Sequence, residues 1–259
     1  MLSDRALVVR AQLMAAWTLL RAFVAGRPRE LPTFVVLSRG RTGSTLLLDL
    51  LRCHPAIHCE GEILSHRILV TSPDALIRAR AALFASRVYG FKLRPPHYNT
   101  QSIRDPKTFL AGLQAEGWRL VHLRRRNVLR VALSSLQRKQ TKIVHRTVGD
   151  ESDESARFDV PIDQLLTRVA RIEQEMRSEE TLLGALPLLR LTYEDDLLRE
   201  GTRQPALDRV FAFLGLPSAP VSTRYVRLST DSLSASIRNH DEVRQALAGT
   251  RSERFLDEP

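Results

Sequence analysis

The stretch that most constrains the fold is FVVLSRGRTGSTLLLDLL, residues 34–51. An apolar run at 34–37 predicts a buried strand, Gly40 and Gly43 predict a sharp turn, and the leucines that follow recur with helical spacing. A strand, a glycine-containing loop and a helix in this order are typical of phosphate-binding units, because the N–H groups and the dipole at a helix start favour an anion. The sequence therefore predicts an anion site at residues 39–45.

This loop differs from the loop that binds the phosphates of ATP. That loop reads G-x-x-x-x-G-K-[ST], with a lysine directly after the second glycine. Here Arg41 lies two residues before Gly43, and Ser44 follows the glycine directly. The chain also offers no clear second acidic strand to hold magnesium. The motif alone leaves two interpretations open: a loop for an anion other than ATP, and a turn without a ligand.

The rest of the chain alternates between apolar, β-rich segments and helical patterns. Strands are predicted at 33–38, 88–93, 118–124 and 188–193, and helices at about 44–53, 73–86, 107–116, 127–140, 160–182 and 204–214. Such alternation is typical of an α/β fold, with a central, mainly parallel sheet flanked by helices. For a chain of 259 residues, we predict a helical segment at 1–30 and a single α/β domain at 31–259.

The net charge and the cysteine content limit the classes of ligand and the cellular compartment that we expect. The net charge of +10 favours a polyanionic ligand, a nucleic acid or an acidic membrane, without choosing among them. Cys53 and Cys59 are the two cysteines, too few for a disulfide framework, so we expect a reducing compartment and a cytoplasmic protein.

The N-terminal segment is apolar, but Arg10 and Arg21 leave an uncharged stretch between them far shorter than the roughly 20 residues of a membrane span. A signal peptide is not expected, because the helical pattern runs almost directly into the strand that begins near Phe34. Two interpretations remain. The segment is an amphipathic helix packed on the domain, or it contacts the inner membrane surface peripherally through residues 5–26.

The loop SRGRTGSTLLLDLL resembles the 5′-phosphosulfate loop of sulfotransferases that use 3′-phosphoadenosine-5′-phosphosulfate (PAPS). The resemblance is to the bacterial carbohydrate-type branch, similar to the trehalose and nodulation-factor sulfotransferases. In that family an Arg or Lys, a hydroxyl residue, a Gly and two Ser or Thr residues bind the phosphosulfate. The matching positions in this chain are Arg41, Thr42, Gly43, Ser44 and Thr45.

The same resemblance implies a second element for the 3′-phosphate: an arginine at a strand end and a serine eight residues later on the next helix. The stretch RRRNVLRVALSS supplies Arg126 and Ser134 at that spacing. An arginine presents a forked, cationic donor set to a phosphate, and the serine hydroxyl adds another donor. Asn127 is a suitable N-cap for the helix between them. Taken alone, RRRN would equally indicate a solvated basic cluster or a nucleic-acid patch.

Transfer of a sulfuryl group to a hydroxyl requires an in-line approach, partners for the developing charge and a base for the acceptor proton. We assign the charge stabilisation to Arg41 and the loop amides, and no metal is required, because a sulfuryl group carries less negative charge than a terminal phosphoryl group.

For the base, the resemblance implies a glutamate shortly after the first helix and before an apolar pair. Glu62 fits this position, with Glu60 as the alternative and His66 or His97 as the next candidates. We expect the apolar neighbours of Glu62 to desolvate its carboxylate and so raise its basicity.

Three other features have competing interpretations. The segment CHPAIHC contains metal-ligand residue types, but its proline interrupts the helix and no distant ligand pair matches it, so we predict no metal site. Lys92 ends a predicted strand, where ligand crevices open, and faces either the reacting group or solvent. Residues 148–161 are acidic and small, which predicts an exposed loop that is either a plain linker or a lid.

The resemblance thus implies transfer of a sulfuryl group from PAPS to a hydroxyl of a carbohydrate or glycolipid, and no nucleic-acid partner. The alternatives are a P-loop-type kinase, which Arg41 disfavours, and a non-enzymatic basic protein that binds nucleic acid or an acidic membrane. The enzyme hypothesis predicts that Arg41 and Arg126 converge on one pocket.

Overall fold

The computed structural model describes residues 4–25, 31–141, 146–147, 157–223, 225–226 and 232–258. Five parallel strands form the central sheet in the order β2-β3-β1-β4-β6. These strands are β1 (Thr33–Ser38), β2 (Ile57–Glu60), β3 (Val88–Leu93), β4 (Trp118–Arg124) and β6 (Leu188–Thr192). The pair β5 (Arg146–Thr147) and β7 (Tyr225–Val226) is separate and antiparallel. All four predicted strands are confirmed, and β2 is the strand of this sheet that the sequence pattern did not predict.

The predicted helices are also present. The helices of the described residues are α1 (Asp4–Ala25), α2 (Ser44–Leu51), α3 (Pro73–Leu83), α4 (Pro95–Thr100), α5 (Pro106–Ala115), α6 (Val128–Thr141), α7 (Ile162–Leu183), α8 (Glu200–Phe213) and α9 (His240–Leu247). Two short helical turns, η1 (Tyr193–Leu197) and η2 (Glu253–Phe255), follow β6 and α9. The helices α4 and α9 were not predicted. Most of the predicted 148–161 loop lies outside the described residues.

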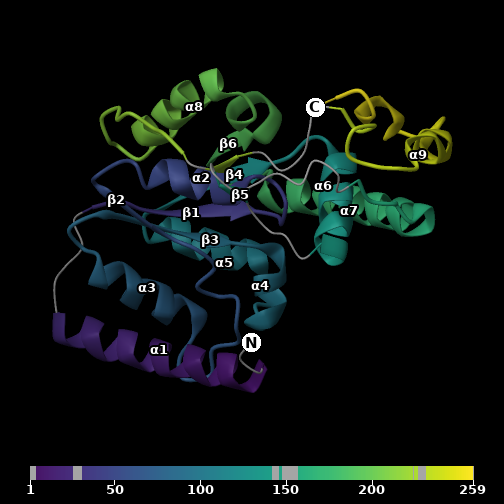
Figure 1. Cartoon of the computed structure of the whole chain (residues 1–259). Helices are drawn as coiled ribbons and strands as arrows, with labels where there is room; N and C mark the ends of the chain where they lie inside the picture. Colours follow the sequence, from purple (N-terminus) through teal and green to yellow (C-terminus); the bar gives the residue numbers. More distant parts are fainter. Residues whose placement is uncertain are drawn as a thin grey trace.

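The helices cover both faces of the sheet, as the alternating pattern predicted (Figure 1). On one face, α2 and α8 pack on the outward side chains of β1, β4 and β6. On the other face, α3, α4 and α5 pack on the sheet, and α1 forms an additional outer layer on α3. A third apolar cluster joins α6, α7 and α9 beyond the sheet. The predicted boundary at residue 30 lies outside the described residues.

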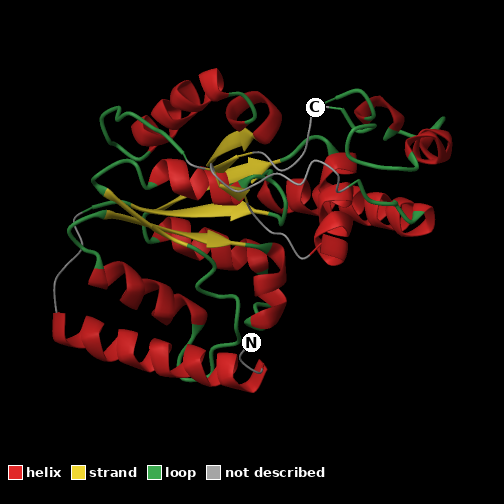
Figure 2. Cartoon of the chain, in the orientation of Figure 1, coloured by secondary structure: helices red, strands yellow, loops and turns green. Residues whose placement is uncertain are grey.

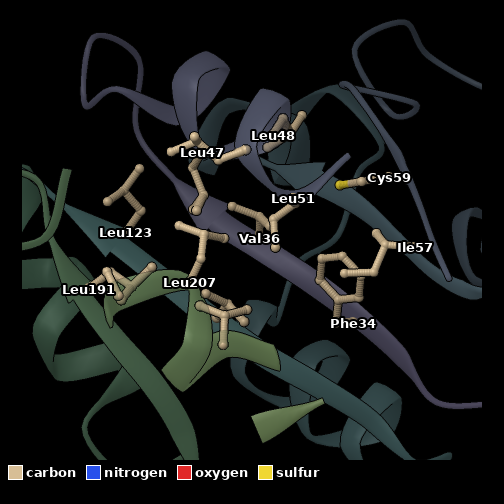
Figure 3. Packing of buried hydrophobic residues seen from close by; sticks show 14 of the residues in the cluster. Phe34, Val36, Leu47, Leu48, Leu51, Ile57, Cys59, Leu123, Leu191 and Leu207 are labelled. Carbon is tan, nitrogen blue, oxygen red and sulfur yellow. The ribbon is translucent and has the colours of Figure 1, made fainter. Parts of the chain in front are cut away.

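The central strand β1 is buried along its whole length. Phe34 and Val36 face α2 and α8, and Figure 3 shows their side chains gathered with leucines of α2 and with Leu207 of α8. Val35 faces the other side, toward α3 and α5. Burial on both faces explains why the strand reads as a continuous apolar run. The ring of Phe34 lies over Gly90 of β3, where a Cβ would come within 2.2 Å of it.

Because the five strands are parallel, their carboxyl ends lie at one edge of the sheet, beside α6 and α7 (Figure 2). This is the edge at which ligand crevices open in α/β folds. The loops that follow β1, β2, β3 and β4 all begin there, so the topology brings the predicted anion loop, Glu62, Lys92 and Arg126 to the same side of the molecule.

Helix α1 is fixed to the domain through α3. Ala15 and Thr18 are buried, and Arg80 of α3 donates a hydrogen bond to the Thr18 hydroxyl at 3.4 Å. Among the described residues, Ala6–Val24 is the one stretch that is long and apolar enough to cross a membrane by length and composition, a criterion that core helices and signal sequences also meet. This criterion tolerates the two charges of Arg10 and Arg21, so the expectation that the segment does not span a membrane stays a prediction.

Candidate active site

The loop between β1 and α2 turns sharply at the carboxyl edge of the sheet. Arg41 and Gly43 both have a positive φ, 67° and 85°. A glycine is required at the second position, because an added Cβ would lie 2.4 Å from the ring of Tyr193. Helix α2 then begins at Ser44, and the first turn of a helix leaves N–H groups without intrahelical partners. The predicted strand–loop–helix unit is confirmed.

The start of α2 opens into a cavity of about 420 Å³. Most of the predicted site residues line it: Arg41, Gly43, Ser44, Thr45, Glu62 and Ser134. Several residues outside the predicted set line it as well, among them Lys92, Arg94, Arg125, Arg130 and Tyr193. Thr42 and Arg126 are the predicted residues that do not.

Arg41 connects the loop to α6. Nε of Arg41 donates a hydrogen bond to the Ser134 hydroxyl at 2.8 Å. Nη1 of Arg125 donates to the backbone carbonyl oxygen of Arg41 at 3.2 Å. Burial, together with repulsion from Arg138 and Arg125, lowers the pKa of Arg41. Positive groups crowded in this way are stabilised by an anion, so the cavity has the charge as well as the backbone of an anion site.

Thr42 and Arg39 shape the loop itself. The Thr42 side chain is buried, and its hydroxyl donates to the carbonyl oxygen of Arg39 at 2.9 Å. Arg39 in turn pairs with Glu175 and Glu179 of α7. A contact between Thr42 and a phosphosulfate would therefore involve its backbone N–H, and this assignment stays a prediction.

The structure does not bring Arg126 into the cavity. Its guanidinium makes two hydrogen bonds of 3.0 Å to Asp195, and its backbone N–H donates to Glu194 at 2.9 Å. Both acidic residues belong to η1, which follows β6, the neighbour of β4. The expected convergence of Arg41 and Arg126 is thus absent, whereas Arg41 and Ser134 do converge. A role for Arg126 at the 3′-phosphate stays a prediction that requires its side chain to leave Asp195.

Arg130 is a cavity residue that the sequence reasoning missed. It is buried and lies four residues before Ser134, so the two side chains share one face of α6. This i, i+4 spacing was the available signal. Asn127 is confirmed as the N-cap of α6, because its Oδ1 accepts the N–H of Arg130 at 2.9 Å.

Glu62 lies at the other end of the cavity, surrounded by donors. Its carboxylate is 2.9 Å from Nζ of Lys92, 3.1 Å from Nη1 of Arg94 and 3.2 Å from Nε2 of His97. The backbone N–H of Arg94 donates to Nδ1 of His97 at 3.2 Å, so the ring proton is on Nε2 and is donated to Glu62. Lys92, which the sequence left between two interpretations, is buried and faces the cavity.

These neighbours make Glu62 more acidic. The hydrogen bond from His97, with those from Lys92 and the charge of Arg94, lowers the pKa of Glu62 far below its ordinary value, although partial burial acts in the opposite direction. The expected gain in basicity is therefore wrong in sign for this arrangement. The sequence showed the apolar neighbours of Glu62, but its cationic partners, Lys92 of β3 and Arg94 just before α4, lie some thirty residues away.

Glu60, the alternative base, lies outside the cavity. It ends β2, and Arg80 of α3 donates two hydrogen bonds to its carboxylate, at 3.0 and 2.6 Å. The hydroxyl of Tyr89 donates a third at 2.5 Å, and burial together with Glu60 raises the pKa of Tyr89. We refer to Glu60, Arg80 and Tyr89 as the edge cluster. It joins α3 to the sheet, which is a structural role.

The histidines of CHPAIHC have ordinary packing roles. Nε2 of His54 lies 3.2 Å from the carbonyl oxygen of Pro217, and the His58 ring stacks on Phe84 with 3.6 Å between centroids. In the part of the chain that the structure describes, no group of three or more His, Cys, Asp or Glu side chains is arranged to hold a metal ion.

No family model matches the chain. Two curated proteins are similar over most of its length. Nodulation protein H of Rhizobium meliloti strain 1021 is 25% identical over 253 residues, covering 86% of this chain and 94% of the relative. A second Nodulation protein H from Rhizobium meliloti is 26% identical over 247 residues with the same coverage. This relationship agrees with the phosphosulfate-type loop and its cavity. The similarity to Nodulation protein H over most of both chains supports an enzyme of the sulfotransferase type.

Solved sulfotransferases are also similar to this chain, more distantly. The sulfotransferase domain of the Synechococcus PCC 7002 olefin synthase has a TM-score of 0.45 at 18% identity, covering 74% of this chain and 76% of that one. A mouse sulfotransferase complexed with PAP, the desulfated form of PAPS, has a TM-score of 0.41 at 15% identity, covering 94% of this chain and 81% of that one.

Proposed function

We propose that this sulfotransferase moves a sulfuryl group from PAPS to a hydroxyl group of a carbohydrate or glycolipid. The observation that carries the proposal is that the start of α2, Arg41, Ser134 and Glu62 line one cavity. An anion site and a carboxylate that faces it are the two parts that transfer to a hydroxyl requires. A kinase-type loop would instead offer a lysine after the second glycine.

In this proposal the loop holds the 5′-phosphosulfate. The N–H groups at the start of α2, with the hydroxyls of Ser44 and Thr45, bind its oxygens, and Arg41 lies beside the bridging oxygen. Ser134 and Arg126 bind the 3′-phosphate. Arg130 joins this set, because it lines the cavity from the same face of α6 as Ser134.

The reaction is an in-line displacement at sulfur. The acceptor oxygen forms a bond to sulfur, the bond from sulfur to the bridging oxygen breaks, and PAP leaves with the electron pair of that bond. The acceptor proton passes to Glu62, and Arg41 stabilises the charge that develops on the departing oxygen. The chain's own cationic groups supply the charge stabilisation, so no metal ion is required.

The low pKa of Glu62 fits a base that becomes stronger when the donor binds. With the hydrogen bond from His97, Lys92 and Arg94 hold the pKa of Glu62 low, and both of these cations line the cavity at the start of α2. A bound phosphosulfate carries negative charge and competes with Glu62 for these two cations. Its binding would therefore raise the basicity of Glu62 at the step in which the acceptor proton is removed.

A second cavity supports the proposed acceptor class. It has a volume of about 1,050 Å³ and shares Gly40, Arg41 and Arg94 with the donor cavity. Its far wall, from α4 and α7, carries amide and hydroxyl side chains suited to hydrogen bonds with sugar hydroxyls: Asn99, Gln174 and Ser178. We propose that the acceptor enters through this cavity and presents its hydroxyl near Arg94.

The first test is ligand stabilisation. PAP at about 100 times its Kd should raise the free energy of unfolding by roughly 2.7 kcal/mol, measured by thermal unfolding, whereas ATP with Mg²⁺ should have little effect. Stabilisation by ATP–Mg²⁺ and none by PAP would overturn the proposal. Incubation with sulfur-labelled PAPS and extracts of lipids or oligosaccharides then identifies the acceptor, and label found on neither class would refute the acceptor assignment.

A further inference from the structure

The exposed large apolar side chains of this protein gather at one place. Among the described residues, all but one of them lie on α1 or on the loop beside it: Val8, Val9, Leu13, Met14, Trp17, Leu20, Phe23, Val24, Leu69 and Val70. The exception is Leu166 of α7. Phe23 is 87% exposed, and Leu13 is 66% exposed. Soluble monomers rarely expose a contiguous apolar surface of this kind unless it binds something. We call these ten residues the α1 face.

The packing of α1 is the reverse of that of an ordinary surface helix. Small and polar residues face α3, with Ala15 and Thr18 fully covered and Ala11 partly covered. Leu13, Leu20, Trp17 and Phe23 face outward, whereas Leu7 and Leu19 are half-buried. A helix that serves only a soluble core directs its large apolar residues inward. The outer side of α1 is therefore suited to contact with an apolar surface.

Side-chain hydrogen bonds hold α1 along the domain. The side-chain amide of Gln12 donates to the carbonyl oxygen of Arg67 at 2.6 Å and accepts the N–H of Leu69 at 2.8 Å. Arg80 bonds to Thr18 further along the helix. These bonds bring Leu69 and Val70 beside the helix, and Figure 1 shows α1 as the outermost layer on this side of the molecule. An orientation across a membrane would break all of them.

The charges around the α1 face suit an acidic lipid surface. Between Ala6 and Val24 the only charged residues are Arg10 and Arg21, both exposed, with no carboxylate among them. The Arg21 guanidinium lies 4.7 Å from the centre of the Trp17 ring. Tryptophan and arginine together are typical of the boundary between lipid headgroups and acyl chains. Exposed Arg67 adds a further positive charge beside Leu69.

We propose that the α1 face docks this sulfotransferase on an acidic lipid surface, with the axis of α1 lying in the plane of the membrane. Large apolar residues on one side, a few arginines near the headgroups and firm attachment on the other side are the features of an interfacial helix. The surface would be the inner face of the membrane, in keeping with the cytoplasmic location expected from the sequence.

The test is sedimentation of the full chain with lipid vesicles. Wild-type protein should sediment with vesicles that contain phosphatidylglycerol and far less with phosphatidylcholine alone. The double variant Leu13→Glu with Trp17→Glu should lose binding at least tenfold. The matched control Leu166→Glu, which adds a charge at the one exposed apolar residue outside the α1 face, should bind as wild type does. Equal binding of the double variant and wild type would overturn the proposal.

Three further readouts separate lipid docking from a folding defect, a dimer interface and a membrane-spanning helix. Both charge variants replace exposed side chains, so their melting temperatures should match wild type. PAP binding should also be unchanged, which separates this proposal from the proposed function.

Vesicles should shift the Trp17 emission to shorter wavelength, while Trp118 is already buried. A dimer in lipid-free solution that the double variant dissociates, without vesicle binding by wild type, would show that a second copy covers the face. Resistance to alkaline carbonate extraction would show a spanning helix, contrary to the proposal.

Discussion

Glu60 and Glu62 are two residues apart, and each is held by several polar side chains, yet they belong to regions with different roles. Glu60 lies in the edge cluster, bonded to Arg80 and Tyr89. Glu62 lines the cavity at the start of α2, and its carboxylate contacts Lys92, Arg94 and His97. In a continuous strand the two carboxylates would point to the same face, because side chains alternate with a period of two.

The difference arises because β2 ends at Glu60. The carbonyl oxygen of Gly61 accepts the N–H groups of both Lys92 and Ile63, so the chain bends after one last contact with β3. The bend turns Glu62 away from α3 and toward the anion loop and His97 of α4. The end of a strand therefore separates a carboxylate that joins α3 to the sheet from one that lines the cavity.

The largest expected effect concerns Glu62. Glu62→Gln keeps the shape of the side chain but cannot accept the acceptor proton, so the rate of sulfuryl transfer should fall by about 10²–10⁴-fold. PAP affinity, measured by calorimetry, should stay near that of wild type. The matched variant Glu60→Gln should retain most of the rate. A dead Glu60→Gln enzyme beside an active Glu62→Gln enzyme would reverse the comparison, and full activity in both would direct the search to His97.

The next effect tests the anion end of the same cavity. Arg41→Ala should lower kcat by about 10²–10³-fold, because it removes a donor beside the oxygen on which charge develops. Arg41→Lys should restore only part of the rate, since a lysine lacks the forked donor geometry. Steady-state kinetics with saturating PAPS provides the measurement. An unchanged kcat in Arg41→Ala would remove Arg41 from the catalytic step.

Glu60→Gln should lower the stability of the fold, whereas Glu62→Gln should lower the rate of sulfuryl transfer. It removes a partly buried carboxylate from Arg80 and Tyr89 and leaves their donors poorly paired, so the free energy of unfolding should fall by about 1–3 kcal/mol. Urea denaturation at neutral pH measures this change. Because Arg80 also bonds to Thr18, α1 should loosen in the same variant. Stability equal to wild type would contradict a structural role for the edge cluster.

The smallest effect concerns Arg126, whose partner differs from the predicted one. If Arg126 leaves Asp195 to bind the 3′-phosphate, Arg126→Ala should weaken PAP binding. Asp195→Asn should then strengthen it by a few-fold, because an exposed ion pair contributes roughly 0.2–1 kcal/mol. Calorimetric titration with PAP measures both variants. Unchanged affinity in Arg126→Ala would show that Arg130 and Ser134 hold the 3′-phosphate without it.

Much of the fold was predictable because its signals are local. The strands β1, β3, β4 and β6 are apolar runs that end near glycines, prolines or charges, and the helices between them have regular apolar spacing. The strand β2 was not predicted because it has four residues, and its sequence, IHCE, alternates buried and half-exposed side chains without a long apolar run. Helix α4 was not predicted because it is short and begins with two prolines, which indicate a turn rather than a helix.

The site was predictable in position but not in side-chain direction. The carboxyl ends of parallel strands share an edge, so Arg41, Glu62 and Ser134 could be expected near one another. The acidity of Glu62 and the attachment of Arg126 depend on partners remote in sequence, Lys92 and Asp195, which lie on other strands or after them. No local pattern shows which charge a side chain will meet.

The strand order β2-β3-β1-β4-β6 also has a consequence for synthesis on the ribosome. The central strand β1 is the first strand of the sheet to be made, yet its neighbours begin only at Val88 and Trp118. At roughly 5–20 residues per second, the nascent chain carries an unpaired strand with an apolar centre, residues 34–37, for several seconds. The leucines of α2 follow at once and can cover Phe34 and Val36, whereas Val35 and Leu37 stay uncovered until α3 and α5, which pack on that face, emerge. Chaperone contact with the nascent chain should therefore concentrate on that uncovered side of β1.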